Sequence, residues 1–288
     1  MSATQAPTIV LIHGAASTAA VWGPLQRELA LRGHRSLAPD LPGHGLNAHH
    51  PAGFYRSPQD LDEFATAPSA LAGVGLSDYA DHVEELVRRV AEHGPVLLAG
   101  TSAGGLPITA VAERAPELVD RLVYLSAWCA VGSDTVGEYV SRPEREGNLF
   151  DRISWPVVGD PADLGVIRIN LRSSDPDLFR TAKAAIMADG TDDEFRALLD
   201  VMEPDANFAI AAEPRFATAA RWGRVPRTFV RFTGDEAIRL AEQDRMIKEA
   251  DELADVRFDV RSIDSSHVGY FHRPAEFADL LGELAAGI

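Results

Sequence analysis

Residues 95–105 read PVLLAGTSAGG, and this stretch decides the fold. It predicts a short apolar strand, then a Gly-x-Ser-x-Gly turn centred on Ser102, then a helix over 106–114. A serine at the tip of such a turn is held in a strained backbone conformation, and the small neighbours Gly100 and Gly104 let strand and helix approach closely. The turn lifts the hydroxyl clear of the sheet and aims the first helical N–H groups at a developing negative charge. The stretch therefore predicts a nucleophilic serine.

The same turn has two other interpretations. A dinucleotide-binding loop requires Gly-x-Gly-x-x-Gly, and its second glycine would fall on Ser102, so this class is excluded. A strand–loop–helix turn without chemistry stays open on the pentapeptide alone, because short motifs recur by chance. The decision rests on whether a base and an acid for Ser102 follow later in the chain.

Strand and helix patterns alternate on both sides of this turn. Compact apolar runs predict strands at 8–12, 35–39, 95–99, 121–125, 227–232 and 256–263. Apolar residues at helical spacing predict helices at 22–32, 77–93, 106–114, 241–252 and 274–285. The alternation predicts an α/β fold with a mostly parallel central sheet and helices on both faces.

Two segments interrupt the alternation. Residues 129–222 carry helical patterns separated by Pro and Gly, which predicts a mainly helical cap inserted into a core formed by 1–128 and 223–288. The helical pieces of the cap are 177–188 and 192–201. Residues 46–76 show neither strand nor helix spacing and consist largely of Pro, Gly, Ala and scattered charges, which predicts a long loop. Such a loop inside a compact domain is usually functional or mobile.

The composition excludes several classes of protein. The chain has 288 residues, of which 46% are hydrophobic and 24% charged, as in an ordinary globular protein. Its net charge of −16 argues against binding to nucleic acid or to anionic membranes. The one cysteine, Cys129, allows no intramolecular disulfide and is expected to be buried, because it follows Trp128 in an apolar stretch. The sequence shows no signal-peptide pattern and no apolar run long enough for a membrane span, so we expect a soluble cytoplasmic protein.

A serine hydroxyl is a weak nucleophile at neutral pH, so Ser102 needs a general base. Of the nine histidines, those beyond the turn are His267 and His272. His267 follows the last predicted strand on the polar loop 264–266 and precedes the final helix, which is where a parallel sheet presents a catalytic base. We predict His267 as the base, and His272, at the entry to the final helix, as a capping or surface residue.

The base in turn needs an acid to orient it. Asp235 lies just past the strand 227–232, after a glycine, and is our prediction. Glu236 beside it is the local alternative, and Asp134 is a second one. Each could be an ordinary loop acid of an acidic protein, but the order Ser102, Asp235, His267, each at a strand end, favours a catalytic set.

An acyl intermediate also needs two N–H donors for its oxyanion. We predict one from Ala103, at the start of the helix after the turn, and one from Ala15, in the loop after the first strand. His13 in that loop is expected to brace it by hydrogen bonds rather than to react. The residues predicted to border the substrate pocket are Gly14, Ala16 and Trp128. Such a set requires no metal and no cofactor.

Four features together resemble the α/β-hydrolase superfamily over nearly the full chain: HGA at 13–15, DLPGHG at 40–45, GTSAGG at 100–105, and His267. More narrowly, FTGDEAI at 232–238, followed by Gln243, resembles the branch that holds plant methyl-ester esterases and hydroxynitrile lyases. In that branch the catalytic acid falls at the position of Asp235, so the resemblance implies the same acid. Residues 46–76 and the cap are longer than in the branch, so the resemblance does not extend to the substrate.

The resemblance also separates ester hydrolysis from lyase chemistry. The lyases of the branch carry a threonine after the first-loop histidine and a lysine directly after the catalytic histidine, where this chain has Gly14 and Val268. That lysine supplies the positive charge that favours cyanide departure, so its absence favours hydrolysis. We therefore expect a serine hydrolase of the carboxylesterase type that cleaves a small, largely uncharged ester or lactone.

Two rival functions use the same fold. One is a non-hydrolytic lyase or cyclase that uses the triad for proton transfer. The other is a hydrolase-fold receptor for a small molecule, with slow or absent chemistry. Function is decided by the site and not by the fold, so both remain alternatives at this stage.

Overall fold

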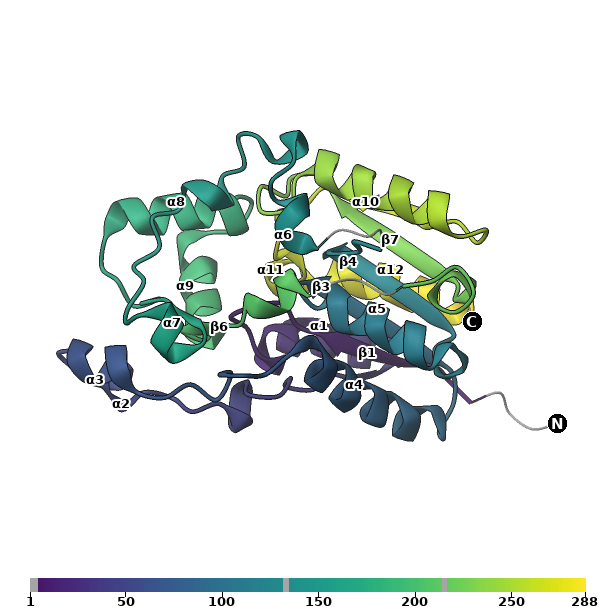
Figure 1. Ribbon diagram of the computed structural model, residues 1–288. Helices are drawn as coiled ribbons and strands as arrows, with labels where there is room; N and C mark the ends of the chain where they lie inside the picture. Colours follow the sequence, from purple (N-terminus) through teal and green to yellow (C-terminus); the bar gives the residue numbers. More distant parts are fainter. Residues whose placement is uncertain (1–4, 132–134, 214–216) are drawn as a thin grey trace.

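The computed structural model describes residues 5–131, 135–213 and 217–288, and its centre is a parallel sheet of six strands (Figure 1). The strand order is β2-β1-β3-β4-β7-β8, and every neighbouring pair runs parallel. The strands are β1 (Thr8–Ile12), β2 (Arg35–Leu37), β3 (Val96–Ser102), β4 (Arg121–Ala127), β7 (Arg227–Phe232) and β8 (Asp259–Ile263). The predicted parallel sheet is confirmed.

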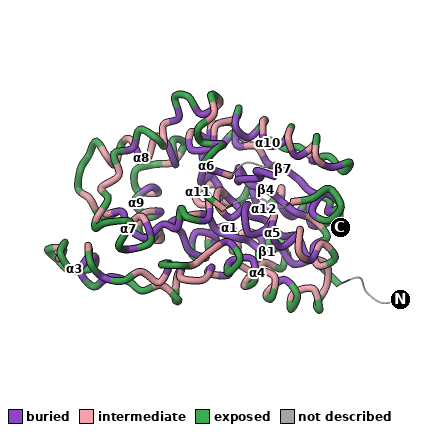
Figure 2. Tube along the Cα trace, viewed as in Figure 1, coloured by how far each residue is buried: buried purple, intermediate pink, exposed green. Residues whose placement is uncertain are grey.

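Helices cover both faces of the sheet because side chains alternate along each strand. In β1, Val10 and Ile12 point to one face, while Ile9 and Leu11 point to the other. The first face is covered by α4 (Leu76–Ala91), α5 (Gly105–Arg114) and α10 (Leu240–Leu253), and the second by α1 (Gly23–Leu31) and α12 (Pro274–Ala286). Figure 2 shows the strands buried, with exposed residues along the outer sides of α4 and α10. Within the described ranges, no helix is long and apolar enough to cross a bilayer.

Between β4 and β7 the chain leaves the sheet, and we call residues 129–222 the inserted segment. Its helices are α6 (Val136–Tyr139), α7 (Pro161–Leu164), α8 (Pro176–Ile186) and α9 (Asp192–Val201), and its two short strands β5 (Ile167–Arg168) and β6 (Asp205–Ala206) pair antiparallel. In Figure 1, α7, α8 and α9 lie to one side of the central sheet. Short 3₁₀ turns of the whole chain lie at Ala19–Trp22, Gly45–Asn47, Pro116–Leu118, Pro143–Arg145, Phe150–Arg152, Ala209–Ala212 and Trp222–Arg224. The helical content agrees with a helical cap, and its boundaries stay a prediction.

Residues 46–76 are not the structureless loop that the sequence suggests. They contain the short helices α2 (Ala52–Tyr55) and α3 (Leu61–Thr66), whose Phe54 and Phe64 are buried against the inserted segment. Helices of four and six residues are too short to show a 3.6-residue period, so the pattern analysis missed them.

A buried arginine joins these two parts of the chain. Arg168 is fully buried, and its Nε and Nη2 donate to Asp205 at 2.6 and 2.8 Å. Its Nη1 donates to the carbonyl oxygens of Phe64 and Ala67 at 2.6 and 2.8 Å. Because the guanidinium is paired and hydrogen-bonded, the cost of burying its charge is offset. This contact attaches α3 to the inserted segment.

Candidate active site

The sharp turn predicted around Ser102 is present. β3 ends at Ser102, whose φ is 51°, and α5 begins at Gly105. A Cβ added to Gly104 would lie 2.6 Å from the carbonyl oxygens of both His13 and Ile12, and one added to Gly100 would lie 2.5 Å from the carbonyl oxygen of Gly104. Both glycines are therefore required by close backbone approach, as the sequence predicts.

Backbone strain collects at one edge of the sheet. In the described ranges, the non-glycine residues with positive φ are Ala16, Ser102 and Ser126. Ser102 and Ser126 lie at the carboxyl ends of the neighbouring strands β3 and β4, and Ala16 lies in the loop after β1. The carboxyl ends of parallel strands meet at one edge, which is where such folds bind ligands. Strain of this kind clusters at functional sites.

Asp235 and His267 meet at the same edge, after β7 and β8. The Nδ1 of His267 lies 2.7 Å from Asp235 Oδ2, and both residues are buried. The other carboxylate oxygen accepts the backbone N–H groups of Ala237 and Ile238 at 2.7 and 2.9 Å. These donors fix the carboxylate, and an ionised carboxylate accepts only. Nδ1 of His267 therefore carries the proton and Nε2 is left as an acceptor.

Ser126 is a partner of Asp235 that sequence analysis missed. Its hydroxyl donates to Asp235 Oδ2 at 2.5 Å, beside the bond from His267. The two residues are 109 positions apart, so no local pattern links them. The only signal was a polar residue near the end of the apolar strand β4.

The structure separates the alternatives for base and acid. Glu236 pairs with Arg239 at 3.6 Å, with both side chains 39% exposed, whereas Asp235 contacts His267. Asp134 lies outside the described residues. His272 ends α11 (Gly269–His272), and its side chain is 2% exposed, so it is not a surface residue; the capping alternative stays a prediction.

The side chain of Ser102 is accessible and makes no hydrogen bond to His267. It is partly exposed, and within the described chain its Oγ makes no hydrogen bond to His267 or to any other residue. Serine–base bonds are often long in unliganded sites and tighten when substrate binds. The positions of Ser102, Asp235 and His267 at strand ends of one edge agree with the predicted set.

The two predicted oxyanion donors lie beside Ser102. Ala15 and Ala103 are partly exposed among buried neighbours, and no acceptor for their backbone N–H groups is found in the described part of the chain. Gly14 brings the first loop against the serine, because a Cβ there would lie 3.0 Å from Ser102 Cβ. Unpaired amides next to a serine hydroxyl are what an oxyanion site needs.

His13 braces this loop, as the sequence predicts. Its ring is fully buried, Nδ1 lies 2.9 Å from the carbonyl oxygen of Gly14, and Nε2 accepts the Leu41 N–H at 3.1 Å. The carbonyl can only accept and the amide can only donate, so one proton sits on Nδ1. The ring therefore ties the loop after β1 to the loop after β2.

A second buried network was missed by sequence analysis. His44 Nδ1 lies 3.0 Å from Glu203 Oε2, and His44 Nε2 lies 3.0 Å from the Tyr79 hydroxyl. The other oxygen of Glu203 accepts the Gly45 N–H at 2.8 Å. Burial raises the pKa of Tyr79 to about 12, so its hydroxyl is protonated at neutral pH. His44 lies in the DLPGHG motif that carries the family resemblance, whereas no motif in the sequence includes Glu203.

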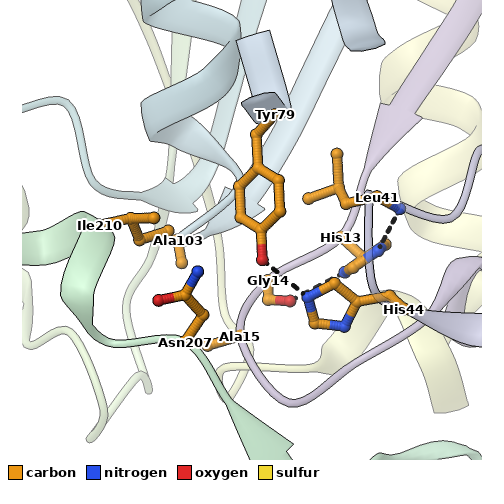
Figure 3. Close-up of a pocket in the computed structure, with 9 residues that line it drawn as sticks. All are labelled: His13, Gly14, Ala15, Leu41, His44, Tyr79, Ala103, Asn207 and Ile210. Carbon is orange, nitrogen blue, oxygen red and sulfur yellow. Dashed lines mark hydrogen bonds between the residues drawn. The ribbon is translucent and has the colours of Figure 1, made fainter. Parts of the chain in front are cut away.

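Figure 3 shows a pocket between this network and the loop after β1. The Tyr79 hydroxyl points to His44, and Ala15, Ala103 and Asn207 lie around the same space. The lining residues are His13, Gly14, Ala15, Leu41, His44, Tyr79, Ala103, Asn207 and Ile210. Gly14 lines this pocket, whereas Ala16 and Trp128 are 8% exposed and do not line it. The substrate-pocket roles of these three residues stay predictions.

Comparisons with known proteins agree with this architecture. A model of the alpha/beta hydrolase family matches residues 9–280. Polyneuridine aldehyde esterase of Rauvolfia serpentina is 29% identical over 126 residues, which is 44% of this chain and 40% of that protein. Pyrethroid hydrolase of Sphingobium wenxiniae is 32% identical over 119 residues, which is 41% of this chain and 35% of that protein. The matched stretches thus span about two fifths of these curated relatives or less.

A solved structure shows the same fold over the whole chain. The crystal structure of a pyrethroid hydrolase from Sphingobium faniae JZ-2 superimposes with a TM-score of 0.73. The alignment covers 97% of each chain at 22% sequence identity. At that identity the likeness establishes the fold.

Proposed function

The chain belongs to the α/β-hydrolase family, and on that premise we propose that it hydrolyses small, largely uncharged carboxylic esters or lactones through an acyl-enzyme. The observation that carries the proposal is the buried His267–Asp235 hydrogen bond of 2.7 Å, at the strand edge where Ser102 sits on its strained turn. The names of the relatives, an esterase and a pyrethroid hydrolase, support an ester substrate.

The proposed mechanism assigns a role to each residue of the site. Ser102 Oγ attacks the ester carbonyl while Nε2 of His267 takes its proton, and Asp235 stabilises the imidazolium that forms. The N–H groups of Ala15 and Ala103 hold the oxyanion. His267 then returns the proton to the leaving alcohol, and later activates the water that releases the acid.

The pocket in Figure 3 borders the predicted oxyanion donors Ala15 and Ala103, and it is too small to hold a whole substrate. No Asp, Glu, Lys or Arg side chain lines it. Of the two histidines that line it, His13 is neutral, because burial, and then the charge of His44, lower its pKa to about 3. The absence of acidic, lysine and arginine side chains beside these donors is in keeping with an uncharged ester group there.

Hydrolysis of p-nitrophenyl acetate by wild type and by Ser102→Ala tests the proposal. We expect the variant to lose about 10³-fold or more in kcat, because the nucleophile is gone. Rapid labelling of the wild type, but not of the variant, by a fluorophosphonate is the matching control. Equal hydrolysis by both proteins would remove Ser102 from the mechanism.

Reaction in ¹⁸O-labelled water distinguishes hydrolysis from the proton-transfer rival. Hydrolysis places label in the carboxylic acid product, whereas a lyase or cyclase does not. An unlabelled product would favour the rival.

A further inference from the structure

Asp189 reaches from the inserted segment to the loop that carries His267. It lies between α8 and α9, and its side chain is 28% exposed. Its carboxylate accepts two bonds from Ser266, one from the hydroxyl to Oδ1 and one from the backbone N–H to Oδ2 at 3.4 Å. Ser266 directly precedes His267 in the chain.

The same carboxylate also holds the chain on the other side of the base. His272 Nε2 lies 3.3 Å from Asp189 Oδ1, and Arg273 Nη1 donates to Asp189 Oδ2 at 2.9 Å. Arg273 Nη1 also donates to the carbonyl oxygen of Asp264, at 2.8 Å, where the loop begins. One acid of the inserted segment therefore contacts residues on both sides of His267.

These contacts differ from an ordinary surface ion pair. The His272 side chain is 2% exposed, and Ser265 and Ser266 are buried. Burial alone would raise the pKa of Asp189, but the contacts with His272 and Ser266 outweigh it and hold that pKa well below its usual range. The carboxylate is thus charged at neutral pH and is fixed by several donors.

We propose that Asp189 is a positioning residue for His267. By accepting hydrogen bonds from Ser266 and Arg273, and through its contact with His272, it sets the loop 264–267 in the conformation in which His267 meets Asp235. Asp189 does not touch the reacting atoms, and it acts on catalysis only through the base. The inference rests on the proposed function, since it assigns a role within that site.

Through Asp189 the inserted segment would act on the position of the base. General base catalysis depends on the position of the base, and a shift of about 1 Å can lower a rate about 100-fold. A base held partly from an inserted segment depends on how that segment docks. The way in which α8 and α9 pack against the core therefore affects kcat, in addition to any effect that it has on substrate binding.

The test is a double-mutant cycle on ester hydrolysis by the full chain, with Asp189→Ala, Ser266→Ala and the double variant. We expect Asp189→Ala to lower kcat about 10- to 100-fold with KM within about twofold of wild type. We expect the double variant to be no slower than the slower single variant, because both changes remove the same contact. The rate at which a fluorophosphonate labels Ser102 should fall in parallel with kcat.

Two further variants separate positioning from folding. Asp189→Asn keeps an acceptor oxygen for the Ser266 hydroxyl, so we expect it to recover part of the kcat lost in Asp189→Ala. Asp193→Asn, on α9, is the matched control, because its side chain is 95% exposed and pairs with Arg196 on the same helix. Thermal unfolding of each variant shows whether it is folded at the assay temperature.

The outcomes are distinct. A change in KM alone, or in thermal stability with unchanged kcat, would overturn the inference and leave Asp189 as a structural clasp. Additive losses in the double variant would also contradict it. If the wild type neither hydrolyses esters nor reacts with the fluorophosphonate, the proposed function itself is wrong, and the role of Asp189 falls with it.

Discussion

The fold keeps the histidine of the first loop in its neutral form. His13 is fully buried, with Gly14 and Leu41 bonded to its two ring nitrogens. Burial, followed by repulsion from His44, lowers its pKa from 6.5 to about 3. The folded protein therefore keeps His13 neutral at pH values where an unfolded chain would protonate it. Protonation of Nε2 would remove the acceptor of the Leu41 N–H, so the bond between the two loops requires the neutral ring.

We predict a specific pH dependence of stability from His13. Because its pKa is lower in the folded state, its contribution is fully present above pH 6.5 and is lost as the pH falls from 6.5 towards 3. The loss is about 1.4 kcal/mol per pH unit in that window, or about 2 kcal/mol at pH 5. Urea unfolding at pH 7.5 and pH 5 measures it. The difference should shrink in His13→Gln and persist in the exposed control His49→Gln; equal differences in all three proteins would refute the assignment.

At the scale of elements, the β3–turn–α5 unit depends on backbone contact with β1. Gly104 packs against the carbonyl oxygens of Ile12 and His13, and Gly105 packs against that of Trp128 after β4. Carbonyl groups of buried strands cannot rotate away without breaking the sheet. The unit that presents Ser102 is thus held by its neighbours rather than by its own helix propensity.

Gly104→Ala should damage this unit. Its Cβ would sit 2.6 Å from two backbone oxygens, so the turn must shift. We expect a loss of about 1–3 kcal/mol in the free energy of unfolding and about 100-fold in kcat. Gly23→Ala, where a Cβ meets nothing within 4 Å, is the control. Full activity in Gly104→Ala would show that the turn tolerates displacement.

Across the whole molecule, the inserted segment is bonded to the core on both sides of α9. Asp189 precedes the helix and holds the His267 loop, while Glu203 follows it and holds His44 and Gly45. The backbone N–H of Glu203 also donates to the carbonyl oxygen of Ala16, at 3.1 Å. α9 therefore connects the loops after β1, β2 and β8.

Replacing Glu203 tests this connection. Glu203→Leu leaves a buried donor on His44 and a partly buried one on Gly45 without their acceptor, so we expect a loss of about 2–5 kcal/mol in the free energy of unfolding. Glu203→Gln should cost less than about 1 kcal/mol, because its amide can accept from Gly45 while His44 changes tautomer. Urea unfolding compares the two variants. Similar losses in both would mean that the charge, rather than the hydrogen bonds, makes the connection.

The sequence by itself determined the sheet, its covering helices and the turn at Ser102, because these depend on local spacing and on glycines at fixed positions. It also gave the order Ser102, Asp235, His267, since each residue follows a recognisable strand. Only the tertiary structure revealed Ser126 on Asp235, Glu203 on His44 and Asp189 on Ser266, which lie 109, 159 and 77 residues apart. Such partners are chosen by how loops and inserted helices pack, and no local periodicity records that choice. The turn at Ser102 could thus be predicted from the chain, whereas the contacts that hold His267 and the loop after β1 were decided by packing.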